Sequence, residues 1–393
     1  MTTAAKTVSG SAPVLYKVEA LTPQEIAYLQ SLAPAVAEHG VTITSTMYNY
    51  MFQTYPQVKS YFNQTNQYTK RQPQVLAFSL FQYISHLGDL TPLTAFVNQI
   101  VAKHCGLDVQ AEQYTVVEKC LNHAFKSVLG NAADEQFFLV FGKAYGNLAQ
   151  LLINAEWEYY KGLQWVGFKE FEVSRKESEC GDVVSIYLSP KDGSQLPKPR
   201  PGQYVGLRWN IDGEENSREY LISQIPKSNE YRLSIRKIDG GIVSEFAHNE
   251  LKVGDSLKVT APVGNFIYDG VSPKDLVLFA GGIGITPLIS IAEAGLKDGK
   301  KVTLLYSNRS AEHRPFGDWL EELKATYPEQ FTYKEFLNNK GENLSANDIK
   351  SVATSEKDVY LLGPVEYMDF VKTELENNCV TDVKLEFFGP TKV

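Results

Sequence analysis

Hydrophobic positions along the chain follow three successive patterns. Up to about residue 160 they recur at helical spacing, which predicts an all-helical domain. From about residue 162 apolar and polar residues alternate, and a period of two is typical of half-buried strands. From Leu276 onward, short apolar runs alternate with helical segments, which favours a parallel α/β sheet. The pattern therefore predicts three folded domains in that order.

Local signals sharpen the helical region. The stretch Thr22-Pro23-Gln24-Glu25 is a capping box with proline at the first helical position, so a helix is expected to begin there and to end near Gly40. Further helices are predicted over 72–87 and 92–105, with Gly88 and Pro92 in the break between them. The last helix has the clearest apolar stripe, formed by Phe137, Phe141, Ala144, Leu148 and Leu151.

The remaining chain carries strand signals of two kinds. Tyr231, Leu233 and Ile235 alternate with polar residues, and short strands of this type continue to about residue 270, as in a small antiparallel barrel. Buried strands are predicted over 276–280, 301–306 and 359–362, with helical segments between them. We therefore expect a flexible tail over 1–18, an all-α domain over 19–160, an antiparallel β-barrel domain over 161–270 and an α/β parallel-sheet domain over 271–393.

Composition excludes several classes of protein. The formal net charge of -8 and the absence of any Lys/Arg cluster argue against nucleic-acid binding. No apolar run approaches the roughly 18 residues that a membrane span requires. The cysteines form no CxxC pair, so neither a disulfide framework nor a zinc site is indicated, and a reducing, cytoplasmic setting is expected. They lie far apart, at Cys105, Cys120, Cys180 and Cys379.

A glycine-rich turn is the first candidate for chemistry. Residues 281–287, Gly-Gly-Ile-Gly-Ile-Thr-Pro, join a predicted strand to a predicted helix. Glycines at such a turn let a pyrophosphate approach the N-terminus of the helix, where unpaired N–H groups attract anions. The turn alone is also compatible with a purely structural role.

Other motifs around this turn add a resemblance. They are Pro201-Gly202-Gln203-Tyr204, Arg218-Glu219-Tyr220, Gly240-Gly241-Ile242-Val243-Ser244, Gly363-Pro364 and Glu386-Phe387-Phe388-Gly389-Pro390. In this order they resemble the ferredoxin–NADP reductase-like superfamily, over about residues 162–393.

That resemblance implies FAD and a nicotinamide dinucleotide as cofactors. It assigns Tyr204, Arg218 and Tyr220 to FAD, with the Arg218 guanidinium paired to the pyrophosphate. It places Gly241, Val243 and Ser244 at a helix that opens onto the same phosphates. Phe388 would lie against the flavin ring. The remaining assignments, around the nicotinamide nucleotide, are Gly282, Gly284, Thr286, Pro287, Gly363 and Pro364.

The helical domain offers few candidates for a haem ligand. Haem iron usually takes an axial histidine whose second ring nitrogen has a hydrogen-bond partner. The domain contains His39, His86, His104 and His123. From the pattern alone His86 and His104 remain rivals, because each lies on a helix with an apolar face.

A second resemblance concerns the helical domain, over about residues 20–160. Its motifs are Met47-Tyr48, Tyr61-Phe62-Asn63, Gln72, Lys103-His104, Tyr114, Gly142-Lys143-Ala144-Tyr145-Gly146 and Glu156. In order and nearly in spacing they resemble the globin of the flavohaemoglobin family, and the fusion of this globin to this reductase is itself specific to that family.

This resemblance makes His104 the proximal iron ligand. Tyr114 and Glu156 would stand behind it, where a carboxylate gives the imidazole imidazolate character. Tyr48 and Gln72 would lie on the distal side.

Four further positions follow from the same resemblance. Leu76 would restrict access to the haem, and Phe62 would wedge it. Lys103 and Glu386 would lie near the electron path between haem and flavin, although an ordinary exposed salt bridge explains them equally well.

The sequence departs from the reductase pattern at two positions. The pattern has a hydroxyl residue after Arg-x-Tyr, facing flavin N5, where this chain has Leu221. It has Cys-Gly-Pro near the nicotinamide, where this chain has Leu362. Both departures put the rate of hydride transfer in question, and Ser223 is a candidate to replace the missing hydroxyl.

The resemblance implies a monomeric nitric oxide dioxygenase with haem b, FAD and NADH or NADPH, which converts NO and O2 to nitrate. It also implies a distal pocket able to take a lipid or azole-type ligand. Two rivals use the same cofactors: an NAD(P)H-dependent hydroperoxide reductase, and an O2-binding or sensing globin with a weak reductase. Arg309 follows the second strand of the last domain and could meet a 2′-phosphate or only solvent, so the choice between NADH and NADPH stays open.

Overall fold

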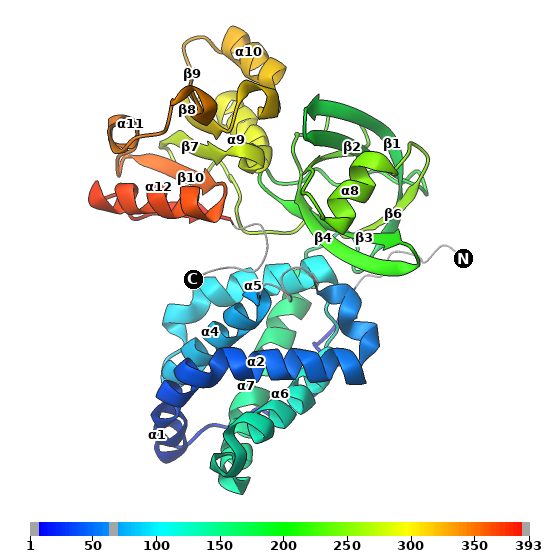
Figure 1. Cartoon of the computed structure of the whole chain (residues 1–393), viewed down its shortest axis with the longest axis vertical. Helices are drawn as coiled ribbons and strands as arrows, with labels where there is room; N and C mark the ends of the chain where they lie inside the picture. Colours follow the sequence, from blue (N-terminus) through cyan, green and yellow to red (C-terminus); the bar gives the residue numbers. More distant parts are fainter. Residues whose placement is uncertain (1–7, 63–69, 387–393) are drawn as a thin grey trace. The chain divides into compact units, whose positions relative to one another are not determined.

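The computed structural model describes residues 8–62 and 70–386 of the 393-residue chain (Figure 1). The chain divides into two compact units. The first contains the helical domain, up to Phe168, together with residues 212–218, and the second contains residues 169–211 and the described chain from Glu219 onward, with the parallel sheet and most of the antiparallel one.

The helical domain begins as predicted, because Thr22 caps the first helix through a complete capping box. The Thr22 hydroxyl accepts from the Glu25 N–H, and the Glu25 carboxylate accepts from the Thr22 N–H. The α-helices in chain order are α1 (Pro23–Ser31), α2 (Ala33–Thr54), α4 (Arg71–Ser85), α5 (Thr94–Leu107), α6 (Gln113–Leu129) and α7 (Glu135–Lys161). Short 3-10 turns are η1 (Pro56–Tyr61), η2 (Thr91–Leu93) and η3 (Gly130–Ala132).

Gly40 does not end a helix, contrary to the prediction. The chain breaks earlier, between Ser31 and Ala33, and α2 continues through Gly40. A Cβ at Gly40 would lie 3.1 Å from the Ala77 Cβ on α4. The glycine therefore permits a close approach of two helices, and sequence cannot distinguish this use from a helix end.

Residues 8–18, which we expected to form a flexible tail, instead lie along α7. The buried Gln150 amide accepts from the Leu15 and Tyr16 N–H groups and donates to the Pro13 carbonyl. The Tyr16 ring packs edge-on against Tyr145. These partners lie more than 120 residues away in the chain, so local composition carries no signal of the docking.

The helical core forms where the apolar stripe of α7 meets α6. Phe125 packs edge-on against Phe137 and Phe141, and Phe137 stacks on Phe141. Asp134 caps α7 by accepting from the Phe137 N–H. Elsewhere α2 packs on α4 and α6, and α5 packs on α7. This packing fixes the helix faces that carry the predicted haem residues.

The barrel domain is an antiparallel six-stranded sheet in the order β4-β3-β6-β1-β2-β5. A bridge between Ile222, just after β4, and Leu233 of β5 joins its two edge strands. The sheet therefore closes on itself, as predicted. Its strands are β1 (Lys169–Cys180), β2 (Val183–Pro190), β3 (Tyr204–Ile211), β4 (Glu214–Leu221), β5 (Tyr231–Arg236) and β6 (Ser256–Val259), with helix α8 (Ile242–Asn249) after β5.

The last domain is a parallel five-stranded sheet in the order β11-β10-β7-β8-β9. In chain order this is the 3-2-1-4-5 arrangement of doubly wound folds, with the order reversing between β7 and β10. Strands are β7 (Asp275–Gly281), β8 (Val302–Asn308), β9 (Phe331–Leu337), β10 (Lys357–Leu362) and β11 (Val383–Leu385). Helices are α9 (Ile285–Lys297), α10 (Gly317–Thr326), α11 (Ala346–Val352) and α12 (Val365–Asn377), with 3-10 turns η4 (Gly282–Gly284), η5 (Ala311–His313) and η6 (Asn338–Lys340).

This topology sets where ligands bind. In open α/β sheets, ligands bind outside the carboxyl ends of the strands at the point where the order reverses. Here that point is bounded by the η4 turn after β7 and by Gly363 after β10. Within residues 8–62 and 70–386, no helix is long and apolar enough to span a bilayer.

Candidate functional site

His104 is the histidine of the helical domain with a buried carboxylate partner. It lies in the last turn of α5, and its Nδ1 lies 2.6 Å from Glu156 Oε1 of α7 and 3.1 Å from the Tyr114 hydroxyl of α6. The Tyr114 hydroxyl donates to the same Glu156 oxygen at 2.5 Å. Glu156 is buried, with a side chain only 4% exposed.

Burial keeps the Tyr114 hydroxyl of this cluster protonated. Burial first, and the Glu156 carboxylate second, raise the pKa of Tyr114 well above its usual value. Tyr114 therefore remains a donor to Glu156 at any ordinary pH. With Nδ1 held by the carboxylate, Nε2 is the nitrogen left for a metal, and in the part of the chain that the structure describes it has no hydrogen-bond partner.

The structure separates His104 from its rival His86. His86 is the C-cap of α4, and its Nδ1 meets the Gln82 carbonyl one turn earlier in the same helix, at 2.9 Å. Such a contact anchors a helix end and needs no ligand. The carboxylate partner that tunes a ligating imidazole is found at His104.

The predicted distal residues also come together. Tyr48 of α2 hydrogen-bonds with Gln72 of α4, and its ring packs edge-on against Phe62 with centroids 5.4 Å apart. Burial raises the pKa of Tyr48, so its hydroxyl remains a proton donor. Leu76 lies one helical turn after Gln72, on the same face of α4. Tyr48, Gln72 and Phe62 thus form one cluster.

These residues fit a haem. Nε2 of His104 is available as an axial ligand, and its side chain is 31% exposed. Several apolar side chains on α4 and α5 are only half-buried, which suits the apolar faces of a porphyrin. They are Val75, Leu76, Phe78, Phe96, Val97 and Ile100.

The predicted FAD residues lie on β3, β4 and α8 of the barrel domain. Tyr204 opens β3, Tyr220 packs edge-on against Trp209, and the half-buried Arg218 donates to the Ser217 carbonyl. A half-buried guanidinium fits an FAD pyrophosphate, and the aromatic rings on the same strands fit an isoalloxazine.

At α8 the predicted residues organise the turn before the helix. Gly241 is the N-cap of α8, and a Cβ there would lie 2.6 Å from the Ser244 hydroxyl. That hydroxyl accepts from the Ile238 N–H and donates to the Gly241 carbonyl. Val243 is buried in the first turn. The Ser244 side chain therefore holds the turn, and any contact with phosphate there would come from backbone N–H groups.

The nucleotide-binding turn is tightly packed. A Cβ on Gly284 would lie 2.3 Å from the Leu362 carbonyl oxygen, and one on Gly363 would lie 3.0 Å from the Gly281 Cα. Gly282 has a φ of +52°. The glycines are therefore required by the close approach of the β7 and β10 ends as well as by any pyrophosphate.

Three other predicted residues flank this turn. The Thr286 hydroxyl donates to the Ile283 carbonyl, and Pro287 is buried in the first turn of α9. Pro364 is the N-cap of α12. Together they fix the helix N-termini at the carboxyl edge of the sheet.

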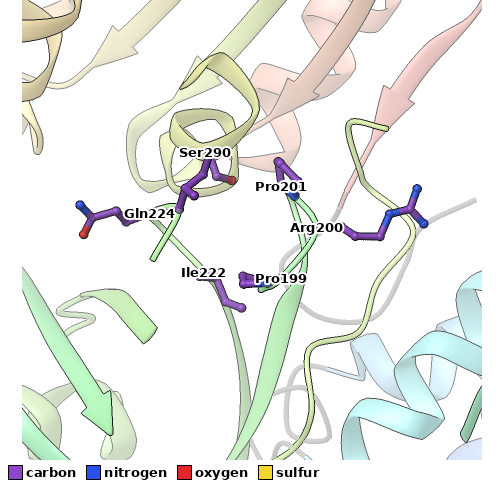
Figure 2. Close-up of a pocket in the computed structure, with 7 residues that line it drawn as sticks. Pro199, Arg200, Pro201, Ile222, Gln224 and Ser290 are labelled. Carbon is purple, nitrogen blue, oxygen red and sulfur yellow. The ribbon is translucent and has the colours of Figure 1, made fainter. Parts of the chain in front are cut away.

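Figure 2 shows a small pocket elsewhere in the second unit, which contains none of the predicted site residues. It lies between the 199–201 segment, Ile222 and Ser290 of α9. The Ser290 hydroxyl accepts from the Gly202 N–H across it. The pocket therefore marks a junction between the barrel and the parallel sheet.

Asp182 and Arg236 form a charged cluster beside the nucleotide turn that the sequence did not predict. Asp182, in the β1–β2 turn, receives a hydrogen bond from Arg309 at 2.7 Å, and its Oδ2 lies 3.6 Å from Arg236 Nε. The Arg236 guanidinium in turn lies against Gly282 of the nucleotide turn. An aspartate in a strand turn is ordinary, so only the fold reveals this cluster.

The two departures from the reductase pattern differ in their surroundings. Leu221 ends β4 and is buried, and Ser223 nearby is fully buried. The Ser223 hydroxyl contacts Ser234 Oγ at 2.9 Å and accepts from Arg232 Nε. Replacing the missing flavin partner would break these bonds, which argues against compensation by Ser223. Leu362 is fully buried at the end of β10.

The structure does not test three of the predicted residues. Lys103 lies on α5 in the first unit, and Glu386 follows β11 in the second, so their pairing remains a prediction. Phe388 lies outside the described residues.

The fold and the His104 cluster define the class of this protein, a globin joined to an oxidoreductase module. Its sequence matches the globin model over residues 45–152, the oxidoreductase FAD-binding domain over 170–268 and the oxidoreductase NAD-binding domain over 278–373. It is 54% identical to a flavohemoprotein of Candida norvegensis, covering 97% of this chain and 98% of that protein, and 45% identical to one of Candida albicans, covering 96% and 99%. The chain belongs to the flavohemoprotein family, which confirms the predicted family and order of domains.

Solved structures agree. A flavohemoglobin from Malassezia yamatoensis, solved with bound FAD and heme, covers 94% of this chain and 100% of its own, with a TM-score of 0.85 at 23% identity, and supports the fold. The FAD/NAD-binding domain of a nitric oxide dioxygenase from Vibrio cholerae covers 56% of this chain and 99% of its own, with a TM-score of 0.51 at 30% identity.

Proposed function

We propose that this chain is a nitric oxide dioxygenase that takes its electrons from NADH or NADPH. The observation that carries the proposal is the 2.6 Å bond between His104 Nδ1 and the buried Glu156 carboxylate. Such a partner makes the axial imidazole a stronger electron donor. A strongly donating ligand is needed more for oxygen activation than for reversible oxygen storage. The named activity of the related Vibrio cholerae domain supports the same conclusion.

Residues of each domain would hold one cofactor. His104 Nε2 would bind haem iron, with Phe62 and Leu76 beside the haem. Tyr204, Arg218 and Tyr220 would hold FAD, and the turns at Gly282 and Gly363 would receive the nicotinamide dinucleotide. When bound, the FAD accepts a hydride and releases single electrons, and the haem accepts electrons and binds diatomic gases.

The protein's own groups then prepare the haem pocket. The Glu156 carboxylate would accept a hydrogen bond from His104 Nδ1, and the Tyr114 hydroxyl, which donates to the same carboxylate oxygen, would fix its orientation. Tyr48 keeps its proton and offers it to a polar diatomic ligand, while Gln72 orients the hydroxyl. Each nitrate contains the nitrogen and oxygen of one NO and both oxygens of one O2, and one electron from NAD(P)H balances its charge.

The test is a stoichiometric one. The purified holoprotein is given NADH and limiting NO under air, and NO loss, nitrate formation and NADH oxidation are followed together. We expect equal amounts of NO consumed and nitrate formed, with two NO per NADH. His104→Ala should abolish this turnover, and His86→Ala, a histidine of the same domain, should retain it. Nitrate formation well below NO loss would refute the proposal.

The same bond favours a second candidate, an NAD(P)H-dependent hydroperoxide reductase. An electron-rich axial histidine also assists cleavage of an O–O bond. The two candidates are separated by supplying NO and a hydroperoxide in parallel. Faster NADH oxidation with the hydroperoxide would favour the second. A third reading, an oxygen sensor with a weak reductase, requires that NADH reduce the flavin slowly.

A further inference from the structure

The second strand of the parallel sheet ends at a charged cluster. In doubly wound sheets the first strand-to-helix turn receives the pyrophosphate, and the region after the second strand receives the adenosine ribose. Here the first strand is β7 and the second is β8, which ends at Asn308. Arg309 therefore stands where a ribose 2′-hydroxyl is told apart from a 2′-phosphate, and an arginine there is normally suited to the phosphate.

Arg309 already has an anionic partner. Its Nη2 donates to Asp182 Oδ2 at 2.7 Å. The Arg309 side chain is 65% exposed, but the Asp182 side chain is only 16% exposed. The carboxylate is thus the buried member of the pair, and the guanidinium is the exposed one.

The backbone, and not Arg309, holds Asp182 in place. The Asp182 carbonyl accepts from the Lys237 N–H at 2.8 Å, and the preceding Gly181 N–H donates to the Glu312 carbonyl at 3.2 Å. Arg236 Nε lies 3.6 Å from the same Asp182 oxygen, and Arg236 also donates to the His313 carbonyl. The main chain at Asp182 is therefore held without Arg309, and Arg236 gives its carboxylate a second cationic neighbour.

A 2′-phosphate at this position would meet Asp182. The phosphate carries between one and two negative charges near neutral pH. To bind Arg309, the phosphate would have to break the ion pair between Arg309 and Asp182. It would then lie close to the negatively charged Asp182 carboxylate, which repels it. A 2′-hydroxyl carries no charge and meets no such repulsion.

We propose that Asp182 is a specificity-determining residue, which neutralises Arg309 and makes this chain prefer NADH to NADPH. The inference rests on the proposed reductase function, since it names the substrate of the same site. Asp182 does not take part in hydride transfer. It acts by discriminating against the extra phosphate.

The experiment is anaerobic stopped-flow reduction of FAD in the holoprotein by NADH and by NADPH. We expect the native chain to favour NADH. Asp182→Asn should raise the NADPH/NADH ratio of kcat/KM by about 1.4- to 5-fold, the range expected for removing one charge beside a phosphate near the surface. Glu230→Gln is the matched control, because it removes a carboxylate paired with Arg175 on the same barrel.

A substitution of Arg309 is the second part of the experiment. In the Asp182→Asn background, Arg309→Ala should remove most of the gain, because the released guanidinium is the group that attracts the phosphate. An unchanged ratio in Asp182→Asn, an equal gain in Glu230→Gln or a gain undiminished by Arg309→Ala would each overturn the proposal. NADH reduction of the native flavin reports separately on the proposed reductase. Calorimetry gives a readout that needs no flavin reduction, by comparing the binding of adenosine 2′,5′-bisphosphate with that of 5′-AMP. Asp182→Asn should strengthen the binding of adenosine 2′,5′-bisphosphate and leave that of 5′-AMP unchanged.

Discussion

Glu156→Gln should raise the reduction potential of the haem. The substitution keeps the size of the side chain and a hydrogen-bond acceptor for His104, but it removes the negative charge 2.6 Å from Nδ1. That charge stabilises ferric haem more than ferrous haem, because the ferric state carries one more positive charge. Its removal therefore makes reduction easier.

The magnitude follows from the geometry. Glu156 is 4% exposed, so solvent screens the interaction little. A hydrogen bond to a charged group contributes about 1.5–3 kcal/mol, and a neutral one about 0.5–1.5 kcal/mol, so the change is about 1–1.5 kcal/mol. At 59 mV and 1.4 kcal/mol per tenfold change for one electron, the potential should rise by about 40–65 mV.

The assay is an anaerobic spectroelectrochemical titration of the haem Soret band. The iron–histidine stretch in resonance Raman should fall in frequency at the same time, because the imidazole donates less. Tyr114→Phe is the matched control, since it leaves the carboxylate in place and should shift the potential by less. A potential that falls in Glu156→Gln, or moves no more than in Tyr114→Phe, would refute the assignment of Glu156.

Further substitutions test the other parts of the site. His104→Ala should lose the five-coordinate histidine spectrum of the haem while FAD stays bound; the assignment is wrong if His86→Ala does this instead. Tyr48→Phe removes a donor to bound O2 worth about 1.5–3 kcal/mol, so O2 dissociation measured by flash photolysis should speed up about 10- to 100-fold; an unchanged rate would remove Tyr48 from the distal pocket. Leu221→Ser combined with Leu362→Cys should speed reduction of FAD by NADH, by up to about 10²-fold if the new hydroxyl acts in the transition state; equal rates in pre-steady-state reduction would show that the native leucines are already compensated.

The sequence by itself determined the features of the structure that depend only on residues close together in the chain. The change of period from helical to alternating predicts the change from helices to strands, and the Thr22–Glu25 capping box fixes where α1 begins. The buried run 276–280 and the glycines after it predict the strand and turn at the nucleotide edge. These features arise within a few residues, so a local pattern is sufficient to predict them.

The tertiary structure decided every pairing between distant residues. His104 and His86 are equivalent as sequence, and only the packing of α5 on α7 brings Glu156, 52 residues away, to one of them. A glycine such as Gly40 is typical of a helix end, but here it lies inside α2 and allows α2 to pack closely against α4. Arg309 meets Asp182 across 127 residues because the barrel turn reaches the parallel sheet. Hydrogen bonds and charge pairs depend on positions in space, and those are fixed only when the hydrophobic faces have packed.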